Sequence, residues 1–296
     1  MADNVATALA EDVRPLRAGW HLGRTVALLL VYLALLVALV VILFPVFWMF
    51  LSSFKGPTEM FARDLTLFPK VWTWENYANV WFNTPFPTYF WNSFHIAAIT
   101  TALSVSVSIY ASYAIARIPF RGRFAFGILL LLTQMFPHIM LVLPLFMIIR
   151  GLGLFNTHAA LIIAYTAFSL PFSIWMLRSF FAAIPSELED AAAIDGATLL
   201  GTLHKVILPL AGPGIAAVAM HTFIQSWNEF LFALVFLQSQ ALRTLPLGLA
   251  SFQEEYSFRW DLLMAGSAIV SLPVLFFFLI MQRFIVQGLL GGAVKG

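Results

Sequence analysis

The polar residues between Gln225 and Glu229 are the side chains in this sequence best suited to hold a polar solute. Gln225, Asn228 and Glu229 supply amide and carboxylate groups, and Trp227 supplies an aromatic face, within an otherwise apolar block. Amides and carboxylates hydrogen-bond hydroxyl groups, and aromatic rings cover the C–H faces of a sugar. A charge in such a block is costly and usually marks a pathway or an ion pair. Glu229 therefore either lines a polar pathway or makes a hydrogen bond that holds two helices together.

A second candidate site is the run Gln134-Met135-Phe136-Pro137 in the third apolar block. Proline removes a backbone N–H donor and clashes with the preceding turn, so it bends a helix. These four residues lie beside such a bend. They are candidates for a gate in a pathway, and simple packing between helices is the alternative.

The sequence offers no support for catalysis. It contains no cysteine, which excludes disulfides, thiol catalysis and thiolate metal sites. Its histidines show no metal-ligand spacing with carboxylates, and no Ser-His-Asp or paired-carboxylate arrangement stands out. The phosphate-binding pattern GxxxxGK[ST] is absent as well. We expect no catalytic residue, no metal and no cofactor in this chain.

The composition indicates which elements position these residues. Of the 296 residues, 61% are hydrophobic and only 10% are charged, whereas a soluble domain has about 25% charged residues. A spanning helix needs about 20 apolar residues, and in lipid every backbone polar group must be bonded internally. We therefore predict an all-α integral membrane protein with six transmembrane helices. The apolar blocks cover residues 25–51, 90–115, 124–149, 159–177, 210–237 and 261–286.

The placement of lysine and arginine predicts the orientation. With the N-terminus inside, ten basic residues fall on the inner side and six on the outer side, and the short linker RIPFRGR alone carries three arginines. We expect residues 1–24 and 287–296 to be cytoplasmic tails and the loop 178–209 to be cytoplasmic too. No basic run interleaved with aromatic residues occurs, so nucleic acid is not an expected partner.

The first outer loop is rich in aromatic residues, with Trp72, Trp74, Tyr77 and Trp81 close together. Tryptophan and tyrosine collect at membrane–water interfaces. The loop is therefore expected to lie on the outer leaflet as a helix. A docking surface for an external partner is the alternative.

The inner loop contains a charged helix between two apolar blocks. Ser186, followed three residues later by Glu189, has the form of a capping box. The helix is predicted from Glu187 to Asp195 and stops at Gly196, a residue suited to a left-handed cap. Acidic residues in its first turns suit the helix dipole.

A second helix is predicted after this bend, from Thr198 to Ile207, and Pro209 then opens the next span. Ala191, Ala192 and Ala193 give the first helix a small-residue surface that another surface could approach closely. The segment is either a surface on which a partner protein acts or a re-entry loop whose charges merely face water.

This segment resembles the signature of the membrane subunits of bacterial ATP-binding-cassette (ABC) importers: EAA, three residues, G, nine residues, I-x-LP. The spacing matches in full, with an Asp for the usual Glu and a Val for the usual Ile. The shorter Asp side chain puts a contact made by the usual Glu in doubt. The matching residues are Asp190-Ala191-Ala192, Gly196 and Val206-Ile207-Leu208-Pro209.

The resemblance extends over nearly the whole chain. It is strongest to carbohydrate importers, and among them to the second permease subunit of maltose-type systems. The supporting motifs are QMFP at Gln134 to Pro137, GLFNTH at Gly153 to His158, SWNEF at Ser226 to Phe230 and GGAVKG at Gly291 to Gly296.

The resemblance implies a type I importer transmembrane domain in a bacterial inner membrane. Such a permease pairs with a second permease to form the sugar pathway. An external binding protein delivers the sugar, and two copies of an ATPase, which bind ATP and Mg, dock underneath. The residues implied in coupling to the ATPase are Glu187, Glu189, Asp190, Ala191, Ala192, Asp195, Gly196 and Pro209.

The same resemblance implies a disaccharide or short oligosaccharide, such as maltose or trehalose, as the cargo. It also implies that the tail ending at Lys295-Gly296 reaches the ATPase, so deleting Gly291 to Gly296 would weaken transport more than membrane insertion. A secondary transporter or channel that works alone is the alternative. It would predict internal repeats and several intramembrane charges, which this sequence does not show.

Overall fold

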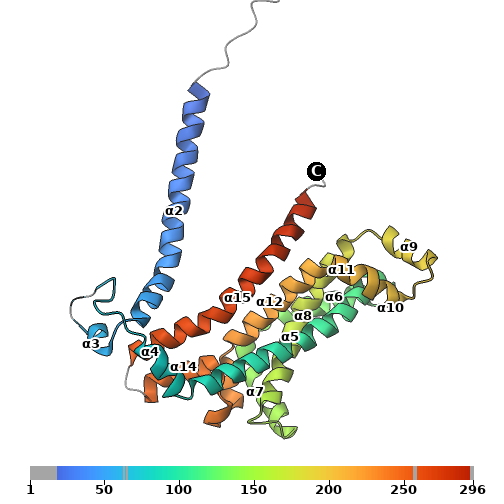
Figure 1. Ribbon diagram of the computed structural model, residues 1–296. Coiled ribbons are helices and arrows are strands. Elements are labelled where there is room, and N and C mark those ends of the chain that lie inside the picture. Colours follow the sequence, from blue (N-terminus) through green and yellow to red (C-terminus); the bar gives the residue numbers. More distant parts are fainter. Residues whose placement is uncertain (1–18, 63, 65, 256–258, 294–296) are drawn as a thin grey trace, which may run out of the picture. The chain divides into compact units, whose positions relative to one another are not determined.

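The computed structural model describes residues 19–62, 64, 66–255 and 259–293, and this part of the chain contains helices and no strands (Figure 1). The residues implied at the end of the tail, Lys295 and Gly296, lie outside the described residues. A π-helical turn spans Leu203–Ile207 and a 3-10 turn spans Gln240–Leu242. The α-helices are α2 (Gly19–Ser53), α3 (Pro57–Met60), α4 (Glu75–Phe82), α5 (Phe86–Arg117), α6 (Arg123–Gln134), α7 (His138–Gly151), α8 (His158–Ala183), α9 (Glu187–Ile194), α10 (Leu199–Thr202), α11 (Leu208–Leu210), α12 (Gly212–Asn228), α13 (Leu231–Phe236), α14 (Leu245–Glu255) and α15 (Trp260–Ala293).

Four described helices are long and apolar enough to cross a membrane, and the number rises to six if each of two bent helix pairs counts as one span. The four are Arg24–Ser53, Phe86–Arg117, His158–Ala183 and Trp260–Ile280. The bent pairs are α6 with α7, and Leu199–Leu210 with Gly212–Asn228. Five of the six apolar blocks of the sequence correspond to these elements, whereas the fifth block, 210–237, overlaps the second bent pair only over α12 and at Leu210.

The chain divides into two compact units, residues 1–51 and 52–296. In the first unit, α2 is strongly apolar after Thr25 and continues through Pro45 without ending. It has the length and composition of the first predicted span.

In the second unit, α5 packs along α8 and α12, α6 packs on α8, and α15 packs on α12 (Figure 1). One face of α5 carries small hydroxyl residues at helical spacing. Small side chains let helix backbones approach closely in a membrane, and the Oγ atoms of Ser104 and Ser169 on α8 are 2.6 Å apart. The buried residues of this face are Ser93, Thr100, Ser104, Ser108 and Ser112.

The contact between α8 and α12 depends on a glycine. A Cβ atom at Gly214 would lie 2.4 Å from Cγ of Phe180, so a larger residue there would push the two helices apart. This close approach fixes the distance between the two helices that carry most of the polar pocket described below.

The third apolar block, expected as one span over residues 124–149, is a bent pair of helices. α6 ends at Gln134 and α7 begins at His138, and the two meet at 99°. Pro137 has an extended backbone, with φ −60° and ψ 127°, and its missing N–H cannot continue α6. The candidate gate residues Gln134 to Pro137 therefore lie at a sharp break.

The fifth block, expected as one span over residues 210–237, is also broken. α12 ends at Asn228, Glu229 is extended with ψ 130°, and α13 begins at Leu231. The Glu229 carboxylate accepts hydrogen bonds from the N–H groups of Phe232 (2.8 Å) and Ala233 (3.3 Å). These amides have no partner within a new helix, so the glutamate stabilises its start and the prediction of one continuous helix was wrong.

The loop after α8, expected on the inner side, folds as two helices around a glycine bend. α9 follows the predicted bounds to within one residue, and Gly196 has a φ of +81°, which confirms the left-handed cap. Thr198 caps the second helix, because its hydroxyl accepts from the Gly201 N–H at 3.1 Å. Pro209 does not open the next span: it lies in α11, before a 78° bend, and α12 starts at Gly212.

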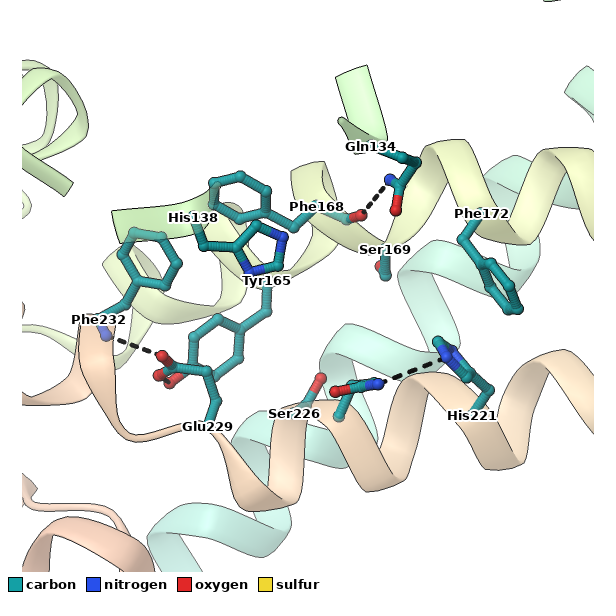
Figure 2. A pocket seen from close by; sticks show the side chains of 11 residues that line it. Gln134, His138, Tyr165, Phe168, Ser169, Phe172, His221, Ser226, Glu229 and Phe232 are labelled. Carbon is teal, nitrogen blue, oxygen red and sulfur yellow. Dashed lines mark hydrogen bonds between the residues drawn. The ribbon is translucent and has the colours of Figure 1, made fainter. Parts of the chain in front are cut away.

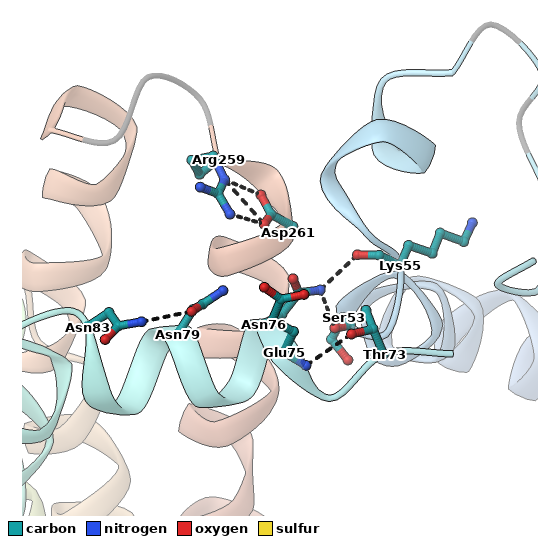
Figure 3. Close-up of polar contacts among 9 residues, drawn as sticks. All are labelled: Ser53, Lys55, Thr73, Glu75, Asn76, Asn79, Asn83, Arg259 and Asp261. Atoms are coloured by element: carbon teal, nitrogen blue, oxygen red, sulfur yellow. Dashed lines mark hydrogen bonds and ion pairs between the residues drawn. The ribbon is translucent and has the colours of Figure 1, made fainter. Parts of the chain in front are cut away.

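The segment expected on the outer side contains polar contacts around α4 (Figure 3). The Asn76 side chain donates to the backbone oxygens of Ser53 (2.9 Å) and Lys55 (2.7 Å). At the start of α15, the buried Asp261 carboxylate pairs with the Arg259 guanidinium, with its shortest N–O distance at 2.6 Å. The Asn76 contacts tie α4 to residues 53–55, and α4 itself packs on α15 and α5.

The aromatic residues of this segment gather around Phe54. Its ring centroid lies 5.4 Å from that of Trp72, 4.8 Å from Trp74 and 5.3 Å from Tyr77. Trp72 and Trp74 keep more than half of their surface exposed. Both the membrane-interface and the docking-surface interpretations stay predictions.

Candidate functional site

A polar pocket lies between α8 and α12, beside the two helix breaks (Figure 2). Its volume is ≈ 230 Å³. α8 contributes residues at positions i, i+3, i+4 and i+7, which share one face of a helix. The lining residues are Gln134, His138, Tyr165, Phe168, Ser169, Phe172, His221, Gln225, Ser226, Glu229 and Phe232.

The pocket wall around Glu229 is built from the chain's own hydrogen bonds. Besides the two amides of α13, the carboxylate accepts a hydrogen bond from the Tyr165 hydroxyl. Three donors thus surround the charge, which offsets part of its desolvation cost. The structure brings Glu229 to the pocket and also gives it a helix-to-helix hydrogen bond, so both roles considered from the sequence are present in one side chain.

Other polar groups of the pocket make weaker hydrogen bonds within the protein. Gln225 Nε2 lies 3.5 Å from His221 Nε2, one turn away on α12, and Gln134 Nε2 donates to the Phe168 carbonyl at 3.3 Å. Both contacts are long for hydrogen bonds. Gln225 and Gln134 can therefore replace these contacts with hydrogen bonds to a hydroxyl group of a bound solute at little cost in free energy.

Aromatic rings form the rest of the pocket. Phe172 stacks on His221 with ring centroids 4.0 Å apart, and Phe168 stacks on Phe232 at 5.0 Å. His138 packs against Phe168 at 4.7 Å. Flat apolar faces next to amides and a carboxylate are the combination that binds a sugar ring.

Two of the candidate pathway residues lie elsewhere. Trp227 is fully buried in the core, where its ring packs against Phe90 and Phe223 at centroid distances of 5.4 and 5.8 Å. Asn228 is exposed and does not line the pocket. For Trp227 this follows from helix geometry, since a residue two positions from Gln225 lies on the opposite side of α12. Asn228 is the last residue of α12.

Sequence reasoning missed most of the aromatic and imidazole groups of the pocket. His221 and Gln225 are four residues apart, and Tyr165, Phe168, Ser169 and Phe172 follow the spacing of one helical face. This spacing was a usable signal. The spacing does not reveal that α8 pairs with α12, which only the tertiary packing shows.

Of the candidate gate residues, Gln134 reaches the pocket, while Met135 and Phe136 point outward with 76% and 59% of their surface exposed. Such exposed apolar groups at a helix break are available to a partner or to lipid. Pro137 supplies the bend itself.

The helix α9 presents one exposed face. Glu187, Asp190, Ala191 and Ile194 are exposed at spacings of three, one and three residues, and Ile194 keeps 87% of its surface exposed. Asp195 and Gly196 extend this surface into the bend, and Pro209 is exposed as well. This face of α9 is therefore open to contact with a partner.

The other face of α9 is fastened to the bundle. Glu189 forms an ion pair with Arg117, with Oε1 2.6 Å from Nε, and accepts a hydrogen bond from the Tyr113 hydroxyl at 3.1 Å. Both partners are on α5, and Ala192 is buried. Arg117 also donates to the Ile184 carbonyl at 2.5 Å. We call the Arg117–Glu189–Tyr113 group the α5–α9 link.

The predicted capping box does not form. Ser186 has helical backbone angles and makes no side-chain cap hydrogen bond. The reason is the α5–α9 link, because a charged pair with Arg117 is stronger than a neutral contact to a backbone N–H. Glu189 therefore belongs to the inside of the structure and not to the exposed face.

Residues 104–291 match the protein family described as "Binding-protein-dependent transport system inner membrane component". The chain is 43% identical over 270 residues to the trehalose transport system permease protein SugB of Mycobacterium tuberculosis, which covers 90% of this chain and 97% of that protein. It is 41% identical over 272 residues to the trehalose/maltose transport system permease protein MalG of Thermococcus litoralis, covering 91% and 97%. With the sulfoquinovosyl glycerol transport system permease protein SmoH of Agrobacterium fabrum it shares 39% over 265 residues, covering 90% and 93%.

The fold matches solved structures as well. In the crystal structure of a bacterial ABC transporter involved in the import of the acidic polysaccharide alginate, one chain aligns with a TM-score of 0.74 at 24% identity, over 91% of this chain and 98% of that one. At this identity the likeness shows the fold, which is that of a type I importer transmembrane domain.

Proposed function

We propose, from the premise that this chain belongs to the family of binding-protein-dependent transport system inner membrane components and is a carbohydrate permease of the MalG type, that it couples sugar import to ATP hydrolysis in a partner. The chain itself holds half of the sugar pathway. A second permease supplies the other half. Two ATPase copies bind ATP and Mg, and an external binding protein delivers the sugar.

The observation that carries this proposal is the two-sided helix α9. One face of the helix is exposed to solvent, and the opposite face is bonded to α5 through the α5–α9 link. A force applied to the exposed face by a partner would be passed to a spanning helix. Packed interfaces have a few discrete arrangements, so a small displacement of α9 would move α5 from one arrangement to another.

The pocket between α8 and α12 is the proposed contribution to the pathway. Gln225 and Gln134 offer hydrogen bonds, and Phe168 and Phe172 offer flat apolar faces. These groups suit a neutral disaccharide or short oligosaccharide such as trehalose or maltose. Relatives named for several different sugars mean that the identity of the sugar must be measured.

The proposed orientation places both termini and α9 in the cytoplasm. It is supported by the excess of basic residues on that side. In Figure 1, α9 and α10 lie at the end of the bundle opposite to α4 and α14. The outer segment would then face the external binding protein.

ATP hydrolysis by the assembled complex in liposomes, with its binding protein and a panel of sugars, tests the proposal. We expect one sugar, with trehalose and maltose as first candidates, to stimulate hydrolysis and to accumulate inside the liposomes. Flat hydrolysis with every sugar in an intact assembly would refute the sugar assignment. Failure to recover any ATPase with the chain would refute the coupling role of α9.

A further inference from the structure

A second cavity lies between the ends of α5, α6 and α8, away from the polar pocket. Its volume is ≈ 260 Å³, and its lining is almost entirely apolar apart from Arg123 and Arg178. Phe124, Leu131 and Trp175 form its apolar walls. Gly127 is part of the wall and leaves room, since a Cβ there would come no closer than 3.9 Å to Trp175.

The two arginines of this cavity have no acidic partner among the described residues. Arg178 lies over the Trp175 ring, 5.3 Å from its centroid, and its Nε is buried without a hydrogen-bond acceptor. Arg123 is the first residue of α6, whose first turn contains no acid. A helix N-terminus carries partial positive charge, so Arg123 adds charge where an anion is favoured.

The position of the cavity corresponds to a membrane interface. Arg178 is five residues before the end of the apolar span α8, and Arg123 begins the α6 span, on the side where Arg117 contacts α9. Long arginine side chains at the ends of spans reach toward lipid headgroups. Basic pockets between spanning helices at this depth bind anionic headgroups.

From this geometry we infer that the cavity is a binding site for an anionic phospholipid. The phosphate lies between the guanidinium groups of Arg123 and Arg178, which bind phosphate through paired N–H donors. The acyl chains lie along Phe124, Leu131 and Trp175. The site is independent of the sugar pocket, and it ties α6 to α8.

The experiment is a titration of phosphatidylglycerol or phosphatidylcholine into the delipidated importer assembly, with bound lipids counted by native mass spectrometry. We expect the wild type to prefer phosphatidylglycerol. The Arg123→Gln/Arg178→Gln variant should bind it about 30-fold more weakly, because each arginine near an anionic headgroup contributes about a fivefold factor. Binding of phosphatidylcholine should not change.

The matched control removes two other exposed basic residues from the same side, Arg121→Gln/Lys205→Gln. Equal losses in both variants would show that only overall charge matters and would overturn the site. Unchanged phosphatidylglycerol binding in the Arg123→Gln/Arg178→Gln variant would do the same.

Two further arms distinguish lipid from other occupants. A photo-crosslinking amino acid at Phe124, which is 81% exposed, should attach to phospholipid. Attachment to a partner subunit instead would show that protein covers the cavity. Displacement of phosphatidylglycerol by millimolar inorganic phosphate would assign the arginines to a soluble phosphate.

Discussion

Glu229 and Gln225 have different roles in the pocket. Glu229 receives hydrogen bonds from Tyr165 and from two amides of α13, so its charge is largely engaged in holding the broken span together. Gln225 has one long contact, to His221. Gln225 makes fewer hydrogen bonds within the protein and is therefore the better candidate for contact with a passing solute.

Replacing Gln225 by Ala should lower sugar uptake several-fold, since one good hydrogen bond contributes about 1 kcal/mol. The melting temperature of the complex should stay unchanged. Radiolabelled sugar uptake in liposomes measures the first effect and thermal unfolding in detergent the second. Asn228→Ala, one turn away and outside the pocket, is the control, and equal uptake by both variants would contradict the role of Gln225.

Glu229→Ala should behave differently from Gln225→Ala. It removes the cap of α13, which costs about 1–2 kcal/mol, and it should lower the melting temperature together with uptake. Glu229→Gln keeps one acceptor oxygen and should retain assembly while lowering uptake. Normal uptake by Glu229→Gln would leave Glu229 with a purely structural role.

Helices act in this protein as elements joined by a few charged contacts. α9 is short, at 8 residues, and a helix of this length is not stable alone. The α5–α9 link supplies what its own sequence cannot. The pair formed by Arg259 and Asp261 is local and balances a buried charge at the start of α15.

Arg117→Gln should uncouple transport from hydrolysis without preventing ATPase docking, because it breaks the α5–α9 link and leaves the exposed face of α9 intact. The ratio of sugar imported to ATP hydrolysed is the measurement. Glu187→Gln, on the exposed face, is the control and should change ATPase retention more than this ratio. An unchanged ratio in Arg117→Gln would show that motion reaches the spans by another route.

Arg259→Gln should destabilise the fold by about 3 kcal/mol, because Asp261 has no exposed surface and would be left as an unpaired buried charge. A fall in the melting temperature of the complex would reveal this. Arg259→Gln combined with Asp261→Asn should recover much of the loss. If the single variant melts like the wild type, the buried pair contributes nothing to stability.

At the scale of the whole molecule, α7 is among the described helices of the second unit that leave an apolar face exposed. Ile139, Met140, Leu143 and Met147 on α7 each keep more than 60% of their surface exposed. The face continues from the break that borders the pocket. A permease that holds half of a pathway needs such a face for the other half.

Because the sequence contains no cysteine, Met147→Cys creates a single attachment point on this face. With a short photoactivatable thiol reagent, we expect a cross-link to the second permease in membranes containing both. Gel mobility and mass spectrometry identify the product. Labelling of lipid alone would place the pairing surface elsewhere.

The sequence by itself determined the class of the protein and the identity of its inner loop. Apolar blocks of spanning length predict helices because lipid leaves the backbone no other partner, and the glycine bend at Gly196 follows from a conformation that favours glycine. These features are local, so nearby residues suffice to predict them.

The tertiary structure alone decided which polar residues meet. Glu189 was expected at a helix cap and pairs with Arg117 instead. Trp227 packs in the core, whereas Tyr165 and His221 border the pocket. Each outcome depends on which helix faces which across the bundle, and that is set by close approaches such as Gly214 against Phe180, which bring together residues far apart in the chain.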